Sequence, residues 1–193
     1  DLVEGVVEKR YGHRRVRVEF NPFFDISDNL ASCWIAREVM SVDFLLLNGD
    51  IIFEAAVLKR VLESGPAPIT LTVNVKDEYD DDDMKVKLSR GLVRRVSKTL
   101  APQQTDCESI GMLYFRGQGP GLFRAAVENA MRHPTSLKLW YLSIIDALAA
   151  DGVVKPCPVT GLGWAELDFL SDLEMAKAIF GGSASQWKVK SKK

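Results

Sequence analysis

Two aspartates that each follow a short strand-like segment are the residues best suited to chemistry in this sequence. Asp50 follows the apolar run at residues 45–47 after Asn48 and Gly49, and Asp168 ends the alternating segment 164–168. An apolar run of this kind predicts a strand buried on both faces, and open α/β sheets bind ligands at the carboxyl ends of such strands. Carboxylates there suit Mg²⁺, which can bridge triphosphate oxygens. We therefore predict that Asp50 and Asp168 meet and share one divalent ion.

Each aspartate also has an ordinary structural interpretation. Asp50 fits a solvated turn after a buried strand, whereas Asp168 fits a polar cluster at a helix start, together with Ser171 or Asp172. Strand alternation also places Glu166 on the same face as Asp168. Both interpretations stay open at this point.

Composition limits the possible partners. The 193 residues are 47% hydrophobic and 26% charged, which is enough for one domain with a real core. The net charge of −1 gives no global basic field for nucleic acid, and no apolar stretch reaches the roughly 20 residues of a membrane span. Three widely separated cysteines predict reduced, buried thiols in a cytoplasmic protein. No nucleic acid or membrane partner is therefore expected.

Helix and strand patterns alternate along the chain. The predicted helices cover residues 1–10, 30–40, 55–64, 122–132, 139–150 and 172–180. The predicted strands cover residues 16–20, 44–47, 69–75, 84–88, 92–98, 110–115, 153–159 and 164–168, and the prolines in 153–159 place it at a sheet edge. This order predicts an α/β fold: a Rossmann-like, mostly parallel sheet with helices on both faces and a small antiparallel hairpin insertion at 84–98. We expect one domain at 1–180 and a flexible, Lys-rich tail at 181–193.

Four further side chains are candidates for binding a substrate. Lys85 and Lys98 each fit a charge directed at a phosphate, although solvated hairpin lysines are common. Trp140 and Tyr141 are adjacent on a predicted helix, so they cannot both face its core. An aromatic face attracts quaternary ammonium groups, but one core aromatic and one at the rim is an equally simple explanation.

Five short motifs occur in an order that carries a family resemblance. They are Asn-Gly-Asp at 48–50, Asp-Met-Lys-Val at 83–86, Glu-Ser-Ile-Gly-Met at 108–112, Trp-Tyr-Leu at 140–142 and Trp-Ala-Glu-Leu-Asp-Phe at 164–169. With these motifs the chain resembles the nucleotidyltransferase superfamily that makes nucleotide-activated sugars and alcohols. The likeness is strongest to its bacterial phosphocholine cytidylyltransferase-like branch and covers about residues 16–180.

The resemblance implies a fold, a reaction and residue roles. The fold would be Rossmann-like, and the phosphate of a small acceptor would attack the α-phosphorus of a nucleoside triphosphate in line, so that pyrophosphate leaves. The triphosphate would be CTP and the acceptor phosphocholine. By the same resemblance Asp50 and Asp168 hold Mg²⁺, and Gly49 lies at the nucleotide. The residues implied to act on the acceptor are Lys85, as a catalytic cation, and Asn29, Lys98, Glu108, Gly111, Trp140 and Tyr141.

Two of these roles compete with simpler structural ones. Asn29 also fits an N-cap of the helix that starts at residue 30, and Glu108 fits a carboxylate at a strand start.

The sequence departs from the family at its start. The first strand, the glycine-rich loop with an arginine and the lysine that follows a proline are not found in it. We therefore expect that an N-terminal segment is missing, that this chain alone can be inactive, and that an exposed sheet edge promotes self-association into a homo-oligomer. Two alternatives remain: a sugar-1-phosphate nucleotidyltransferase, and a non-catalytic nucleotide- or ligand-binding domain that lost the phosphate loop.

Overall fold

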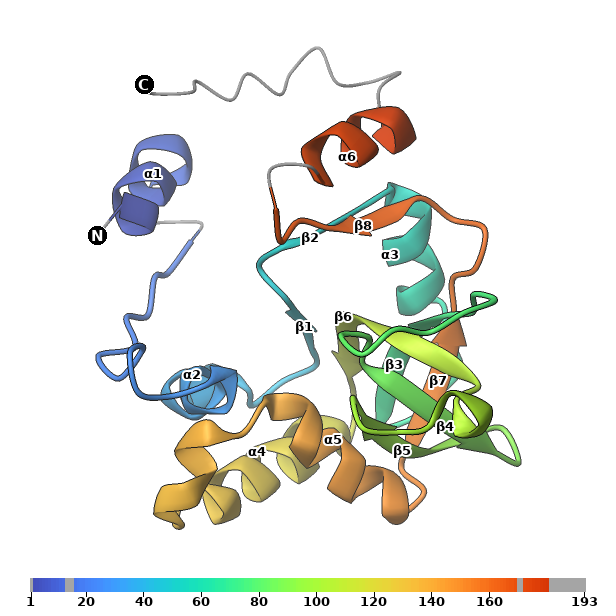
Figure 1. The fold of residues 1–193 in the computed structure, drawn as a ribbon. Helices are drawn as coiled ribbons and strands as arrows, with labels where there is room; N and C mark the ends of the chain where they lie inside the picture. The colour runs from blue at the N-terminus through green and yellow to red at the C-terminus, as the bar shows by residue number, and fades with distance from the viewer. Residues whose placement is uncertain (1, 13–15, 170–171, 181–193) are drawn as a thin grey trace.

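A computed structural model describes residues 2–12, 16–169 and 172–180 of the chain (Figure 1). The helices are α1 (Leu2–Tyr11), α2 (Asn29–Ile35), η1 (Ala36–Val39), α3 (Ala55–Leu62), η2 (Pro102–Gln104), α4 (Gly119–Ala130), η3 (Pro134–Lys138), α5 (Tyr141–Ala150) and α6 (Asp172–Phe180). The strands are β1 (Phe44–Leu47), β2 (Ile51–Phe53), β3 (Ile69–Asn74), β4 (Lys85–Ser89), β5 (Leu92–Ser97), β6 (Cys107–Phe115), β7 (Val154–Pro158) and β8 (Trp164–Glu166).

Within the described residues the strands form one six-stranded sheet and one two-stranded ribbon. The sheet has the order β5-β4-β6-β3-β7, with β1 also paired to β6, and the ribbon consists of β2 and β8. Strand β7, which holds two prolines, lies at the end of this order, as its sequence predicts. The α/β class expected from the sequence is confirmed.

The directions of the strands are more mixed than the sequence suggests. Strands β1 and β3 both pair antiparallel with β6, and β3 pairs parallel with β7, so β1, β3 and β7 run in one direction. Strand β6 lies between β1 and β3 and runs against them. The β4–β5 pair is the predicted antiparallel hairpin, and its turn uses Arg90 (φ 52°) and Gly91 (φ 73°). Two successive positive φ angles give a turn whose twist matches that of the strands.

Helices cover both faces of the sheet, as expected. On one face, α2, α4 and α5 enclose a core that includes Leu71, Leu113 and Ile145. On the other face, α3 packs Val57 and Val61 against Ile110 and Met112 of β6. Successive residues of β6 therefore serve opposite cores, because side chains alternate along a strand. Strand β6 therefore lies between the two cores.

Several local expectations need correction. Residues 16–20 form no strand among the described residues, and Phe20 is exposed there, since alternation alone does not supply a neighbouring strand. The helix expected at 30–40 is α-helical only to Ile35 and then tightens into the 3-10 helix η1. The helix expected from 139 begins at Tyr141, after η3. The tail 181–193 lies outside the described residues.

No helix in the described ranges combines the length and the apolar character that a membrane crossing requires.

Candidate active site

The β2–β8 ribbon brings the two predicted aspartates to one end. Ile51 pairs with Glu166, and the carbonyl of Asp50 accepts the N–H of Leu167 at 2.9 Å. Asp168 follows directly, with its own N–H donated to the Asp172 carboxylate at 2.9 Å. Residues 118 positions apart in the sequence thus become near neighbours through one short ladder.

Part of the helix-start interpretation of Asp168 is also correct. The Asp172 carboxylate accepts the N–H groups of both Asp168 and Phe169 just before α6, while Ser171 lies outside the described residues. This contact uses the backbone of Asp168, and its exposed carboxylate stays available for another role.

Glu166 adds a third carboxylate to the group. Burial raises its pKa above the ordinary value of 4.5, and the negative charges of Asp50 and Asp168 raise it further. The side-chain amide of Asn48 acts in the opposite direction as a hydrogen-bonding neighbour. The three acids therefore lie within electrostatic range of one another.

One oxygen of this group has no partner. Oδ1 of Asp50 is buried and makes no hydrogen bond, although Asp50 as a whole is only partly buried. A buried polar atom without a partner is costly, and it marks a position where a ligand can bind. Among the described residues no three His, Cys, Asp or Glu side chains gather closely enough to hold a metal alone. Mg²⁺ commonly takes one or two carboxylates together with water and substrate phosphates, so Asp50 and Asp168 fit such an ion.

Asn48 connects this acid group to the sheet and to α5. Its backbone N–H binds the carbonyl of Gly111 at 2.9 Å, and its Oδ1 accepts the hydroxyl of Tyr141 at 2.8 Å. Gly111 has a φ of +73°, and a Cβ there would lie 2.7 Å from Cγ of Asn48. Glycine is required at 111 both by its backbone angle and by this close approach.

Asn29 caps a helix other than the expected one. Residue Asp28 occupies the N-cap position of α2 and makes no side-chain capping bond, whereas Oδ1 of Asn29 accepts the N–H of Tyr141 at 2.8 Å. Asn29 therefore satisfies the first residue of α5, which lies more than a hundred residues later. Asp28 supports the same junction through a 3.0 Å bond from Nε1 of Trp140.

The two adjacent aromatics diverge as the sequence predicts. Tyr141 is 3% exposed and Trp140 is 39% exposed, so one enters the core and the other faces solvent. The ammonium of Lys98 lies 4.9 Å from the centroid of the Trp140 ring. The aromatic surface expected to receive a cationic substrate is thus covered by a cation of the chain itself.

Lys85 and Glu108 are both buried cross-strand partners. Lys85 is 2% exposed and its Nζ donates to the carbonyl of Lys98 at 3.0 Å. Glu108 is 5% exposed and is bound by Asn74 at 2.9 Å and by Lys76 at 3.0 Å. Lys85 can reach a substrate only if it releases this carbonyl. Glu108 is the second residue of β6, so it lies at a strand start as its alternative interpretation states, and it is buried there.

Sequence reasoning missed a second charged cluster around Glu108. Lys76 bridges Glu108 and Asp83, with a 2.8 Å bond to the latter. Burial raises the pKa of Glu108 above 4.5, although Asn74 and Lys76 pull it back. The acidic run 80–83 looks like a solvated loop in the sequence, and nothing local indicates that Asp83 meets Lys76. For Asn48, in contrast, its position two residues before Asp50 was a usable signal.

Comparisons with known proteins support the fold. The chain is 24% identical over 206 residues to CMP-5'-(3-aminopropyl)phosphonate synthase of Streptomyces rubellomurinus, a match that covers 98% of this chain and 31% of that protein. The chain thus spans about a third of the curated relative that it matches. No family model matches.

Two solved structures are similar over most of their length. The inositol-1-phosphate CTP transferase from T. maritima superposes with a TM-score of 0.70 at 20% identity, covering 94% of this chain and 73% of that one. The CTP:phosphocholine cytidylyltransferase from Streptococcus pneumoniae gives 0.71 at 12% identity, covering 93% and 74%. The chain therefore has the α/β fold of these two solved transferases.

Proposed function

We propose that this chain is a nucleotidyltransferase domain that joins a nucleoside triphosphate, CTP first, to a small acceptor with a phosphate or phosphonate group. Pyrophosphate is the second product. The observation that carries the proposal is the buried, unpartnered oxygen of Asp50 beside Asp168 and Glu166. A buried carboxylate oxygen without a partner is costly in a fold, and a divalent cation with triphosphate oxygens would compensate it.

In such a reaction, different residues of the chain would bind the ion, position the loop that carries Asp50 and align the acceptor. Asp50 and Asp168 would hold the ion, which would neutralise charge on the triphosphate and polarise its α-phosphorus. Asn48 fixes the loop that carries Asp50, because three of its contacts tie it to β6, α5 and Glu166. The chain itself then needs only to align the acceptor oxygen with phosphorus.

The charges around the site favour an acceptor with a positive end. The carboxylates of Asp50, Asp168 and Glu108 all act on Glu166 and, after the larger effect of burial, contribute to its raised pKa. Such an excess of negative charge attracts an ammonium group. Phosphocholine leads among the acceptors, and aminoalkylphosphonates come next, because the names of the similar cytidylyltransferase and of the curated relative both specify a cationic group joined to a phosphorus acid.

A direct assay tests the proposal. The full chain, with any upstream coding sequence restored, is incubated with Mg²⁺, each of the four ribonucleoside triphosphates and one acceptor at a time, and pyrophosphate release is measured. We expect release with CTP and phosphocholine or 3-aminopropylphosphonate, and its loss in Asp50→Asn and Asp168→Asn. Asp151→Asn, an exposed residue after α5, is the matched control and should retain activity.

The same assay separates the alternatives. Release with a sugar 1-phosphate but not with the cationic acceptors would identify a sugar-1-phosphate nucleotidyltransferase. Calorimetric binding of CTP and Mg²⁺ without release for any acceptor would identify a non-catalytic binding domain. No binding of any nucleotide by the full chain would reject the proposal.

A further inference from the structure

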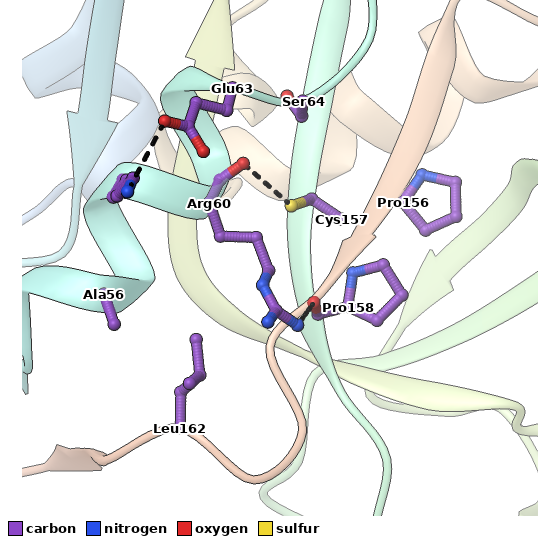
Figure 2. Close-up of a pocket in the computed structure, with 9 residues that line it drawn as sticks. Ala56, Arg60, Glu63, Ser64, Pro156, Cys157, Pro158 and Leu162 are labelled. Carbon is purple, nitrogen blue, oxygen red and sulfur yellow. Dashed lines mark hydrogen bonds and ion pairs between the residues drawn. The ribbon is translucent and has the colours of Figure 1, made fainter.

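A cavity of about 730 Å³ opens between α3 and β7, on lining residues that the proposed transfer site does not use (Figure 2). Ala56, Lys59, Arg60 and Glu63 line one wall, and their spacing puts them on one face of α3. Pro156, Cys157 and Pro158 of β7 form the facing wall, and Leu162 closes one side. Small-molecule sites commonly have this size and an apolar wall with a few polar groups.

Positive charge dominates this cavity. Arg60 donates one bond to the carbonyl of Pro158 at 3.4 Å, the long end of the hydrogen-bond range, and it has no carboxylate partner in the described part of the chain. Lys59 pairs with Glu63 only at 3.9 Å, with both side chains well exposed. An exposed ion pair of this length restrains the Lys59 side chain only weakly. The side chains of Lys59 and Arg60 can therefore both reorient to bind a ligand.

Arg116 adds a third cation behind the wall. Its guanidinium donates to the carbonyl of Ser64 at 2.8 Å and to its hydroxyl at 2.6 Å, and Ser64 itself lines the cavity. Nε of Arg116 is buried without a partner, and no carboxylate of the described residues forms an ion pair with it. The charges of Arg60 and Arg116 both act to lower the pKa of the Cys157 thiol, against the larger effect of burial. Both guanidinium groups therefore act on the same cavity wall.

The facing strand argues against a peptide as the occupant. Strand β7 is at the end of the sheet order, where an added strand would pair, but Pro156 and Pro158 have no N–H to donate. The two prolines instead supply rigid apolar surface. A ligand that matches this cavity needs an apolar body for the prolines and Leu162 and an anionic group for Arg60.

We propose that the α3–β7 cavity is a second binding site, for a small organic anion whose apolar body packs on Pro156, Pro158 and Leu162 and whose phosphate or carboxylate binds Arg60 and Lys59. The site is separate from the acid group of Asp50, which repels such a ligand. It therefore stands whether or not the chain transfers nucleotides. Phosphate and carboxylate share this chemistry, and the experiment distinguishes them.

Titration of the isotope-labelled full chain, followed by amide NMR, tests the site. The probes are phenyl phosphate, benzoate, inorganic phosphate and benzyl alcohol. We expect saturable shifts at the amides of residues 56–64, 157 and 162 with phenyl phosphate or benzoate. Inorganic phosphate, which has no apolar body, and benzyl alcohol, which has no anionic group, should both bind more weakly. The tighter of phenyl phosphate and benzoate identifies the anionic group.

Variants decide whether the cavity is responsible. Arg60→Gln should weaken binding by about tenfold or more, because a charge-assisted hydrogen bond is lost, and Lys59→Gln should weaken it less. Arg132→Gln, an exposed arginine after α4, is the matched control and should bind normally. Asp50→Asn should also bind normally, which keeps this test independent of nucleotidyl transfer. Shifts that do not saturate, or that persist unchanged in Arg60→Gln, would overturn the proposal.

Discussion

The hydroxyl of Tyr141 donates to Oδ1 of Asn48 at 2.8 Å, and this bond joins the start of α5 to the loop that carries Asp50. The same asparagine packs against Gly111 on its other side. The loop position is thus set by one residue of β6 and one of α5.

Replacement of Gly111 by alanine should displace Asn48. The variant must adopt a φ of +73° and place a Cβ 2.7 Å from Cγ of Asn48, so we expect the free energy of unfolding to fall by about 1–3 kcal/mol. Mn²⁺ binding, measured by electron paramagnetic resonance, should weaken as well. Gly161→Ala is the matched control, since Gly161 has a φ of +85° with nothing within 4 Å. Equal effects of both variants would mean that backbone strain alone is responsible.

Replacement of Asp50 by asparagine should abolish divalent cation binding without lowering the stability of the fold. The change removes one negative charge beside Glu166, so urea unfolding should show an unchanged or modestly higher stability, by about 1 kcal/mol at most. Divalent cation binding should be lost in the same variant. A large loss of stability would instead show that the Asp50 carboxylate has a structural role.

Lys76 should stabilise the fold in a pH-dependent way. The Lys76 ammonium lowers the pKa of Asp83 from its ordinary 3.8, so this contribution is present above that value and is lost as pH falls through the lower folded value. Burial raises the pKa of Glu108, so its ionisation above 4.5 destabilises the fold most when Lys76 is absent.

The corresponding measurement is urea unfolding of Lys76→Met from about pH 2.5 to about pH 8, so that the range includes the titration of Asp83 below 3.8. The deficit relative to the unmodified chain should grow as pH rises. Lys87→Met is the control, because Lys87 forms a more exposed pair with Asp106 at 3.3 Å, and its deficit should stay small. A deficit for Lys76→Met that is constant across this range contradicts the expectation.

Replacement of Asn29 tests its role as a cap of α5. Asn29→Ala should lower stability by about 1 kcal/mol, as loss of an N-cap does, whereas Asn29→Asp keeps an acceptor oxygen and should be nearly neutral. Thermal unfolding provides the measurement. If both variants were equally stable but differed in the KM of the acceptor, Asn29 would be a binding residue and not a cap.

Lys98 should compete with a cationic acceptor for Trp140. Removal of its ammonium in Lys98→Met uncovers the ring, so the affinity for phosphocholine should rise by about threefold, the size of one exposed cation–π contact. Calorimetry with phosphocholine and with inorganic phosphate distinguishes the cationic end from the phosphate. A weaker affinity for both would assign Lys98 to the phosphate, as the sequence analysis suggested.

Short sequence patterns predicted those helices, strands and turns whose bounds depend on residues close together in the sequence. The strand 44–47 and the helix 172–180 have the predicted bounds, and the hairpin forms at its expected turn. The segment 16–20 failed because alternation indicates a strand but does not provide a pairing partner. Strand β2 was missed for the converse reason, since three residues become a strand only through their pairing with β8.

The site was predictable in part for the same reasons. Asp50 and Asp168 could be found as carboxylates at strand ends, and the structure places them at one end of a ribbon. The burial of Lys85 and the capping of α5 by Asn29 depend on contacts between distant segments, which residue type alone does not encode.

The short β2–β8 ribbon has one more consequence. Because Asp50 precedes β2 and Asp168 follows β8, the pairing of these two strands positions one aspartate relative to the other. Asn48 ties the Asp50 loop to β6 and α5, so the same two contacts also set where the Asp168 segment lies relative to the sheet.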